Sequence, residues 1–363
     1  MTFSLYLFII ILNFWAANRY SKTNRANRFI SIISFIGLFV LIGGYRNESG
    51  LSNDISNLGY EFDSVLGGGD SIYEGLFAYI IALGRYTADY YEWRYALSLV
   101  SLFLLFYSSY KWSKNPHLPI ALFAAYLSVL SAEQLRNFLA MAVFQIGLVY
   151  YIFSPNKKRD KLIYVLTTLL ASSIHTSFII YIIIIFYETL LESRTKRIAF
   201  GVIIGILCFG IFLGGNNIGG LSTLMNSIND NRFSVYLSTT TRFGFVLPIM
   251  LHLSVLYYLS VAQKVEPDSV VIRRMLTINT ILMVVFPLYM IQLSFYRIER
   301  NILYVSYISI ASAYNFSQRS NETSKFTFSY ILSLILWIVI DLFITTPKEN
   351  LLIPFFSDNF FLQ

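Results

Sequence analysis

Long apolar runs separated by short polar segments dominate the 363-residue chain. Twelve such runs lie at about residues 3–17, 29–44, 95–110, 119–132, 135–153, 162–173, 176–190, 198–214, 243–261, 275–292, 301–315 and 326–345. Helices of about 20 residues cross a hydrocarbon core of roughly 30 Å and satisfy their own backbone hydrogen bonds there. The pattern predicts an all-α integral membrane protein of about twelve transmembrane helices, forming a single polytopic membrane domain over 1–363.

Two apolar stretches are too long for one crossing and are interrupted near their centres. The polar residues of the stretch 119–153 are concentrated at 133–136, and those of 162–190 at 172–176. A single helix of 35 residues would be roughly 52 Å long, which exceeds the hydrocarbon thickness. Each stretch is therefore predicted to be a pair of short helices joined by a turn.

The basic residues favour the same arrangement. The short loops Lys111–Lys114, Lys157–Lys161 and Arg194–Arg197 are all basic, and basic loops lie on the cytoplasmic side of a membrane. If each long stretch were one helix, these loops would alternate between the two sides. With two helix pairs they all lie inside, 18 of the 27 Lys and Arg residues fall on that side, and both chain ends lie outside.

The nine cations left outside are unusual in type, because eight of them are arginine. They are Arg46, Arg85, Arg94, Arg136, Arg232, Arg242, Arg297, Arg300 and Lys348. Two long outer loops are expected: 45–94, which is rich in Asp and Glu, and 215–242, which is rich in Gly, Asn, Ser and Thr. An apolar patch at Leu76–Leu83 is expected to lie in the membrane interface or to dip inward. The second loop has the composition of a mobile lid or an open loop.

Composition excludes several classes of protein. The chain is 56% hydrophobic and 13% charged, with a mean hydropathy of +0.60, so a soluble domain could not bury its apolar surface. A soluble enzyme, a disordered regulator and a disulfide scaffold are excluded, and the single Cys208 has no intrachain partner. The basic residues are scattered among loops, which argues against a nucleic-acid partner. With three histidines and no metal or nucleotide motif, we expect no metal and no cofactor.

Three polar residues lie at the two predicted outer turns, where the flanking helices look too short to cross comfortably. They are Gln134, Arg136 and His175. Both turns are therefore expected below the outer membrane surface, where polar groups are costly and usually functional. The alternatives are that Arg136 reaches up to the lipid headgroups and that His175 caps a helix.

Further arginines are expected on the same side. Arg297 and Arg300 occupy one outer turn, with Glu299 between them, and Arg46 follows the second apolar run. In the alternative reading, Glu299 pairs with one arginine and Arg46 is an interfacial anchor. A guanidinium binds phosphate at two points, so arginines facing outward in a membrane cavity suit a lipid-borne diphosphate. Fixed guanidinium groups stabilise the charge of a leaving diphosphate without a metal.

Candidate bases are concentrated in the segment 45–94, whose carboxylates could deprotonate an acceptor hydroxyl. These carboxylates include Asp54, Glu61, Asp63, Asp70 and Glu74. His175 is a further candidate, because the ordinary pKa of histidine is near neutral. For each carboxylate the alternative is a solvated position in a loop.

Several short motifs follow one another along the chain. They are Arg46 with Asp54 and Tyr60, Tyr73-Glu74-Gly75, Gln134-x-Arg136-x-x-x-Ala140, Ile174-His175-Thr176-Ser177, the late Arg297, and Ile353-Pro354-Phe355. In this order, and over nearly the whole chain, the sequence resembles the EpsG family of multi-pass membrane proteins, which is related to the Wzy polysaccharide polymerases.

The resemblance implies a GT-C-like enzyme that joins oligosaccharide repeat units into exopolysaccharide, capsule or O-antigen. Donor and acceptor would be carried on undecaprenyl diphosphate, at the outer face of the bacterial cytoplasmic membrane. Inverting transfer without a metal or a nucleotide sugar is expected. Besides the bilayer, a flippase and a chain-length regulator would be partners.

The cations of the expected site would bind phosphate groups. Arg136 and Arg297, with Arg300, would hold the donor diphosphate and stabilise it as a leaving group. Arg46 and Arg242 would hold the phosphate of the acceptor lipid or the growing chain.

The remaining expected site residues would handle the sugar and its proton. Asp54, Glu74 or His175 would orient or deprotonate the attacking hydroxyl. Tyr60 and Gln134 would contact the substrate.

Three other functions remain open at this point. A flippase for the same lipid-linked glycan would also use paired short helices, but it must present cations to both leaflets. A GT-C glycosyltransferase using a polyprenyl-monophosphate sugar would use Glu61 and Asp63 as metal-linked acids. A scaffold of an export complex would tolerate replacement of the outer arginines.

Overall fold

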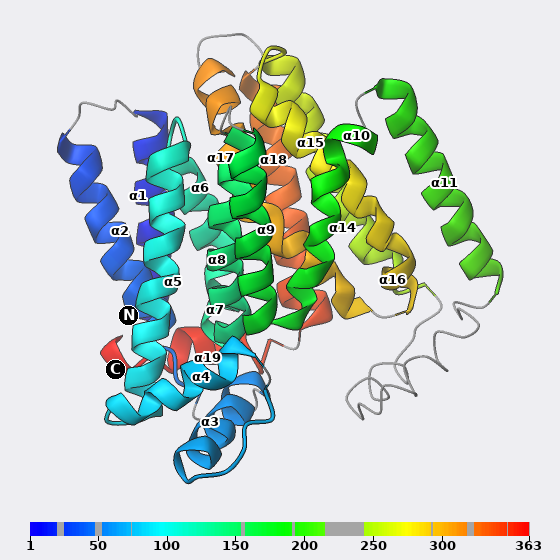
Figure 1. Cartoon of the computed structure of the whole chain (residues 1–363). Coiled ribbons are helices and arrows are strands. Elements are labelled where there is room, and N and C mark those ends of the chain that lie inside the picture. The colour runs from blue at the N-terminus through cyan, green and yellow to red at the C-terminus, as the bar shows by residue number, and fades with distance from the viewer. Residues whose placement is uncertain are drawn as a thin grey trace. The chain divides into compact units, whose positions relative to one another are not determined.

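Helices make up the described chain (Figure 1). The computed structural model describes residues 1–19, 25–47, 53–73, 75–153, 157–190, 193–214, 243–291, 293–317, 323–346 and 348–362. Over these residues the only extended pairing is an isolated antiparallel bridge between Tyr45 and Asn359. The predicted all-α fold is therefore confirmed for this part of the chain.

The chain divides into two compact units, each built from separate parts of the sequence. Unit 1 comprises Met1–Ile182, Tyr304–Thr323 and Trp337–Gln363. Its elements are α1 (Thr2–Asn18), α2 (Arg25–Gly43), α3 (Asn53–Leu66), α4 (Leu76–Ala82), η1 (Leu83–Tyr86), α5 (Tyr90–Trp112), α6 (His117–Leu122), η2 (Phe123–Leu127), α7 (Ser128–Glu133), α8 (Leu135–Phe153), α9 (Lys157–Ile174), the first part of η3 (Thr176–Phe186), most of α17 (Arg297–Ser317), η6 (Ile338–Thr345), α19 (Leu352–Ser357) and η7 (Phe360–Leu362).

Unit 2 comprises Ile183–Leu303 and Ser324–Leu336. Its elements are the end of η3, α10 (Tyr187–Leu190), α11 (Arg194–Leu213), α14 (Val246–Val265), α15 (Val270–Ile281), η4 (Leu282–Val285), α16 (Phe286–Ile291), η5 (Leu293–Tyr296), the first turns of α17 and most of α18 (Thr323–Trp337). The single polytopic domain expected over 1–363 stays a prediction.

The long apolar helices indicate an integral membrane protein. Six described segments are long and apolar enough to cross a bilayer: Ala26–Gly43, Leu135–Phe153, Arg194–Leu213, Val246–Val265, Val270–Met290 and Ser324–Thr345. Shorter apolar helices lie at Thr2–Asn18, Leu76–Tyr86, His117–Glu133 and Thr176–Phe186. The total of about twelve spans stays a prediction.

Both long apolar stretches are broken where the polar residues interrupt them. Between α7 and α8 the helix stops at Gln134, whose φ and ψ are −100° and 59°. The second stretch stops at the end of α9 and continues as the 3-10 helix η3. Tyr164 on α9 donates a hydrogen bond of 2.5 Å to the Tyr181 carbonyl on η3, so the chain reverses direction between them. The predicted helix pairs are confirmed.

The outer segment 45–94 is not the loop that we expected, because much of it is helical. In α3 the apolar residues Ile55, Leu58 and Phe62 are buried at helical spacing, although acidic residues surround them in the sequence. The apolar patch itself forms the helix α4. The next helix, α5, begins at Tyr90, because the Asp89 side chain caps it by accepting a hydrogen bond of 2.8 Å from the Glu92 amide. The second expected loop, 215–242, lies outside the described residues.

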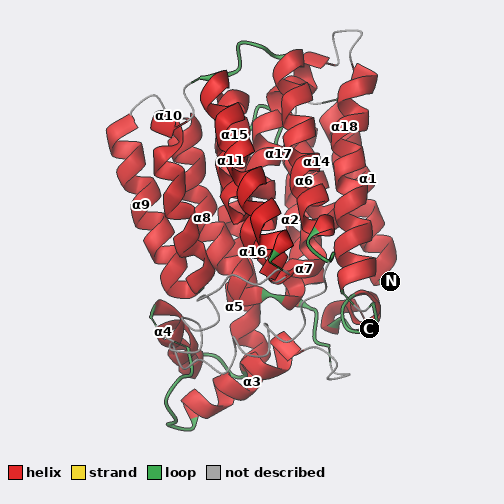
Figure 2. Ribbon diagram, turned by 90° about the vertical axis from the view of Figure 1, so that its right-hand side faces the viewer, coloured by secondary structure: helices red, strands yellow, loops and turns green. Residues whose placement is uncertain are grey.

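Three short helices and both chain termini lie at one end of unit 1 (Figures 1 and 2). Figures 1 and 2 show α3, α4 and α19 at the same end as both chain termini, which we call the α3–α4 end. Phe3 and Phe356 pack edge to face there, with ring centroids 5.2 Å apart. The shared location of the termini agrees with the sidedness expected from the basic loops.

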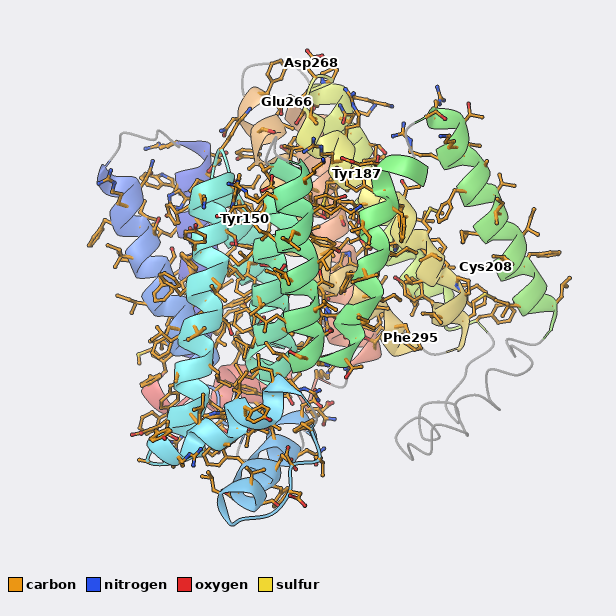
Figure 3. The ribbon with its side chains drawn as sticks, in the orientation of Figure 1. Tyr150, Tyr187, Cys208, Glu266, Asp268 and Phe295 are labelled. Atoms are coloured by element: carbon orange, nitrogen blue, oxygen red, sulfur yellow. The ribbon has the colours of Figure 1, made fainter. Side chains whose placement is uncertain are left out.

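In unit 2, basic residues are concentrated at one end. Glu266 and Asp268 mark the turn between α14 and α15, and Phe295 precedes α17 at the opposite end (Figure 3). The α14–α15 turn is flanked by basic residues, Lys264, Arg273 and Arg274. The turn that carries Arg297 therefore lies away from the basic end of its own unit.

Candidate functional site

Glu133 is the central carboxylate of the α3–α4 end, at the break between α7 and α8. Its Oε2 accepts a hydrogen bond of 3.0 Å from the Tyr45 hydroxyl, and the Ile55 amide also hydrogen-bonds to the carboxylate. The residue is half-buried. Sequence reasoning treated Glu133 only as part of the helix break, because nothing in the sequence brings residues 45, 55 and 133 together.

Tyr45 is held in place by the C-terminal segment. Besides the bridge to Asn359, the Phe360 amide donates a hydrogen bond of 2.8 Å to the Gly44 carbonyl. A Cβ on Gly44 would lie 2.4 Å from Asn359 Oδ1 and 2.5 Å from the Val40 carbonyl oxygen, so only glycine fits. Burial, and next the neighbouring Glu133 carboxylate, raise the pKa of Tyr45 far above its ordinary value. Tyr45 therefore remains a hydrogen-bond donor.

Arg46 follows Tyr45 and is oriented by two aromatic rings. Its guanidinium carbon lies 4.5 Å from the ring centroid of Tyr91 and 4.1 Å from that of Phe360. Its amide donates to the Asp358 carbonyl at 3.3 Å. The residues that follow the Ile353-Pro354-Phe355 motif therefore hold the Arg46 segment in place, a role that the sequence did not reveal.

Arg94 is a second arginine near Glu133, and it is 1% exposed. One terminal nitrogen donates to the Ala132 carbonyl at 2.8 Å, whereas Nε and Nη1 have no hydrogen-bond partner among the described residues. Its charge acts electrostatically on Glu133. In the sequence Arg94 is only one of the outer cations; the signal that marks it is its position directly before the apolar run 95–110.

Arg136 joins the two broken helix pairs. Its Nε donates a hydrogen bond of 2.7 Å to the Ile174 carbonyl, the last residue of α9. The guanidinium carbon also lies 4.3 Å from the Tyr73 ring centroid and 5.2 Å from that of Phe77. Arg136 therefore caps the C-terminus of α9. Its position relative to the lipid headgroups stays a prediction.

His175 lies at the same junction. Its Nδ1 and Ser177 Oγ are 2.8 Å apart, and its amide donates to the Ala171 carbonyl at 2.8 Å. Gly75, with a φ of +71°, brings the start of α4 against α9: a Cβ there would lie 2.8 Å from the Ser173 carbonyl oxygen. Three parts of the chain that are far apart in the sequence therefore meet at one place: Tyr73 with Gly75, Arg136, and the segment 174–177.

The acidic residues of α3 separate into two kinds. Asp54 is exposed and acts electrostatically on Glu133, and Tyr60 is 77% exposed. Glu61 is buried and accepts hydrogen bonds of 2.6 Å from both the Ser71 hydroxyl and the Ile72 amide. Glu61 thus closes the loop after α3. Within the described ranges no three His, Cys, Asp or Glu side chains gather as a metal site would require.

The other expected cations belong to unit 2. Arg297 is exposed at the start of α17, and Arg300 is 2% exposed with its guanidinium carbon 5.6 Å from the Tyr296 ring centroid. The expected alternative of an ion pair with Glu299 is wrong, because this carboxylate lies 3.3 Å from His252 Nδ1. A shared site of Arg136 and Arg297 stays a prediction.

Two expected site residues, Glu74 and Arg242, lie outside the described residues. Gln134 occupies the helix break itself, and its amide donates to the Leu130 carbonyl at 2.8 Å. In unit 1 the described contacts group Glu133 with Tyr45, Asp54 and Arg94, and they group Arg136 with Tyr73, Phe77 and the end of α9. Guanidinium groups at such positions can bind anionic groups.

Comparison with protein families gives one match. The model described as the EpsG family matches residues 32–357, which is most of the chain. No curated protein matches, and no solved structure matches.

Proposed function

The chain belongs to the EpsG family, which is associated with exopolysaccharide biosynthesis, and we propose that it is a polysaccharide polymerase. In this proposal it joins oligosaccharide repeat units carried on undecaprenyl diphosphate. The reaction takes place at the outer face of the bacterial cytoplasmic membrane. A flippase would supply the units, and a chain-length regulator would limit the product.

The observation that carries the proposal is the meeting of separate motifs around Glu133 and Arg136 at the α3–α4 end. Arg46, Arg94 and Arg136 come from three different parts of the chain. Each has a contact that holds it in place before any ligand binds. Guanidinium groups fixed in this way stabilise the negative charge that develops on a departing diphosphate, because they need not reorganise during the reaction.

Glu133 is our preferred base for the attacking hydroxyl. The acceptor sugar oxygen would attack the anomeric carbon of the donor as its bond to the diphosphate breaks, and the hydroxyl proton would pass to Glu133. The diphosphate leaves with the bonding electron pair, and the anomeric configuration inverts. Tyr45 and the Ile55 amide orient the carboxylate, as a general base requires. We prefer Glu133 as the base over Asp54, Glu74 and His175, which the sequence suggested.

The donor and acceptor would be recognised by groups around this carboxylate. Arg136 would hold the donor diphosphate, and Arg297 with Arg300 would contribute if unit 2 faces the same ligand. Arg46 and Arg242 would hold the acceptor. Tyr60, which is exposed, and Gln134 would contact sugars. Neither a metal nor a nucleotide sugar enters this scheme.

A lipid-linked glycan flippase is the second candidate, and the two broken helix pairs favour it, because such breaks are frequent in transporters. Against it, the described contacts of Arg46, Arg94 and Arg136 all lie at one end of unit 1. The metal-dependent glycosyltransferase has less support, because Glu61 is committed to Ser71 and Ile72.

The test compares Arg136→Ala and Glu133→Gln with Arg85→Ala in cells that depend on this protein for polymer. Arg85 is an exposed arginine in η1 and serves as the matched control. We expect both site variants to accumulate single lipid-linked repeats outside the membrane, at unchanged protein level, while the control makes polymer.

Two outcomes would overturn the polymerase. Loss of external single repeats in the site variants would indicate a flippase or an earlier step. Normal polymer in both site variants would indicate a scaffold.

A further inference from the structure

The short helical segment formed by α4 and η1 is apolar on both its buried and its exposed face. No side chain of α4, Leu76–Ala82, is charged. On the buried face, Phe77 and Ile81 are fully covered, and a Cβ on Gly84 would clash with the Phe62 ring. A helix that is hydrophobic all round is typical of a protein interior or a membrane, not of a surface in water.

Three large side chains follow one another along the exposed face. Tyr79, Leu83 and Tyr86 are spaced four and three residues apart, which puts them on one side of the helical segment. They are 72%, 54% and 78% exposed. Single exposed apolar residues are common on soluble surfaces, but a continuous stripe marks an interaction surface. We call these three residues the α4 stripe.

The segment is too short to cross a membrane, and it lies crosswise to the long helices. Residues Leu76–Tyr86 would span roughly 16 Å as a helix, about half of the hydrocarbon core. Figure 1 shows the axis of α4 running across the ends of α8 and α9, and Figure 2 shows α4 below the end of α9. A helix in this orientation can insert one face among the lipids of a single leaflet.

The segment begins where the exposed apolar surface of α9 ends. Gly75, directly before α4, packs closely against Ser173 in the last turn of α9. The exposed side chains of Leu166, Leu169 and Leu170 lie on α9 just before that turn. The same helix packs along α8, which is long and apolar enough to cross the bilayer. The α4 segment therefore starts at the edge of the surface that faces lipid.

We propose that the α4 stripe docks in the membrane leaflet at the α3–α4 end, which is the outer leaflet in the predicted topology. Tyrosine suits the headgroup level of a membrane, because its ring is apolar and its hydroxyl stays hydrated. Leu83, between the two tyrosines, adds an aliphatic group that gains free energy in lipid and none from contact with water. The occupant of this face is therefore lipid.

The same segment connects the leaflet with Arg136. Phe77 on the buried face of α4, and Tyr73 before it, both lie against the Arg136 guanidinium. A lipid-linked donor would therefore reach Arg136 from the leaflet along α4, with its diphosphate at the headgroup level. This path rests on the proposed function, whereas the docking of the stripe does not.

Fluorescence quenching in liposomes tests the docking. The full chain in a Cys208→Ser background carries one labelled cysteine, as Tyr79→Cys, Leu83→Cys or Tyr86→Cys. Ser64→Cys, an exposed position on α3, is the control, because α3 lies beyond α4 in Figures 1 and 2. Lipids brominated near the headgroup should lower the emission of the stripe labels by about twofold or more and leave the control nearly unchanged. Iodide in the buffer should quench the control more strongly than the stripe labels.

Two results would overturn the docking. Stripe labels that iodide quenches as strongly as the Ser64→Cys label would show that this face lies in water, open to a glycan or a soluble protein. Stripe labels shielded from both quenchers would show that protein covers the face. Neither readout needs polymer synthesis, so the docking can fail while the polymerase stands, or hold if the chain is a flippase.

A kinetic variant tests the path from the leaflet to Arg136. Leu83→Gln keeps the size of the side chain but disfavours insertion into lipid. The concentration of lipid-linked repeats at half-maximal rate should therefore rise by about threefold or more, at an unchanged maximal rate. Ala88→Ser, an exposed position just beyond η1, is the control. A fall in the maximal rate alone, or no change in either parameter, would contradict the path along α4.

Discussion

At the scale of single residues, three arginines of unit 1 differ from solvated surface cations, because contacts with rings and carbonyl groups hold their side chains in place. Arg136 donates to a helix-terminal carbonyl while its planar face lies over Tyr73 and Phe77. Arg46 lies between two rings, and Arg94 is buried with donors to spare. Lysine could not reproduce these combinations, because its ammonium is a compact charge without a planar face.

Arg136→Lys should therefore be almost as damaging as Arg136→Ala. The ammonium keeps the charge but loses the planar group that caps α9 and whose geometry suits phosphate. We expect polymer yield to fall by about tenfold or more in both variants, measured on gels against membrane protein level. Polymer near the parent level in the lysine variant would show that charge alone suffices at this position.

At the scale of elements, the broken helices were predictable and the contacts between motifs were not. Polar residues at 133–136 and 172–176 mark the breaks, because a helix with charged groups at that depth is costly. The third helix was missed because its three acidic residues equal in number its buried stripe of Ile55, Leu58 and Phe62. The pairing of Glu133 with Tyr45 depends on packing across 88 positions, which no local pattern encodes.

The C-terminal segment is an element whose role can be tested by stability. Asn359 Nδ2 donates to the carbonyls of Val40 and Leu41, at 2.9 and 3.3 Å, near the end of α2. Asn359→Ala should lower the free energy of unfolding by about 1–3 kcal/mol, because the Val40 and Leu41 carbonyls each lose the hydrogen bond from this side chain. It should also reduce polymer, since the Arg46 segment is released.

Ser357→Ala is the matched control for that change. Its exposed hydroxyl bonds only the Ile353 carbonyl four residues earlier, at 2.8 Å. Unfolding in mixed detergent micelles measures both variants. Equal stability of Asn359→Ala and Ser357→Ala would show that the C-terminal segment does not hold α2.

At the scale of the whole molecule, the account depends on which side of the membrane each end faces. Single cysteines in a Cys208→Ser background report this directly. Tyr60 and Thr176 are exposed at the α3–α4 end, whereas Lys114 and Asp268 are exposed near the basic ends of their units. An impermeant thiol reagent should label the first two in intact cells and the last two only after permeabilisation. Labelling of Lys114 or Asp268 in intact cells would invert the predicted topology.

Synthesis of polymer by the purified chain tests the central claim most directly. The protein is reconstituted in liposomes with undecaprenyl-diphosphate-linked repeat units, a chelator and no nucleotide sugar. The account predicts a ladder of joined repeats, with one undecaprenyl diphosphate released for each new linkage, and no ladder from Glu133→Gln. Single repeats that remain unjoined in the parent, while the same liposomes move them between leaflets, would contradict the account.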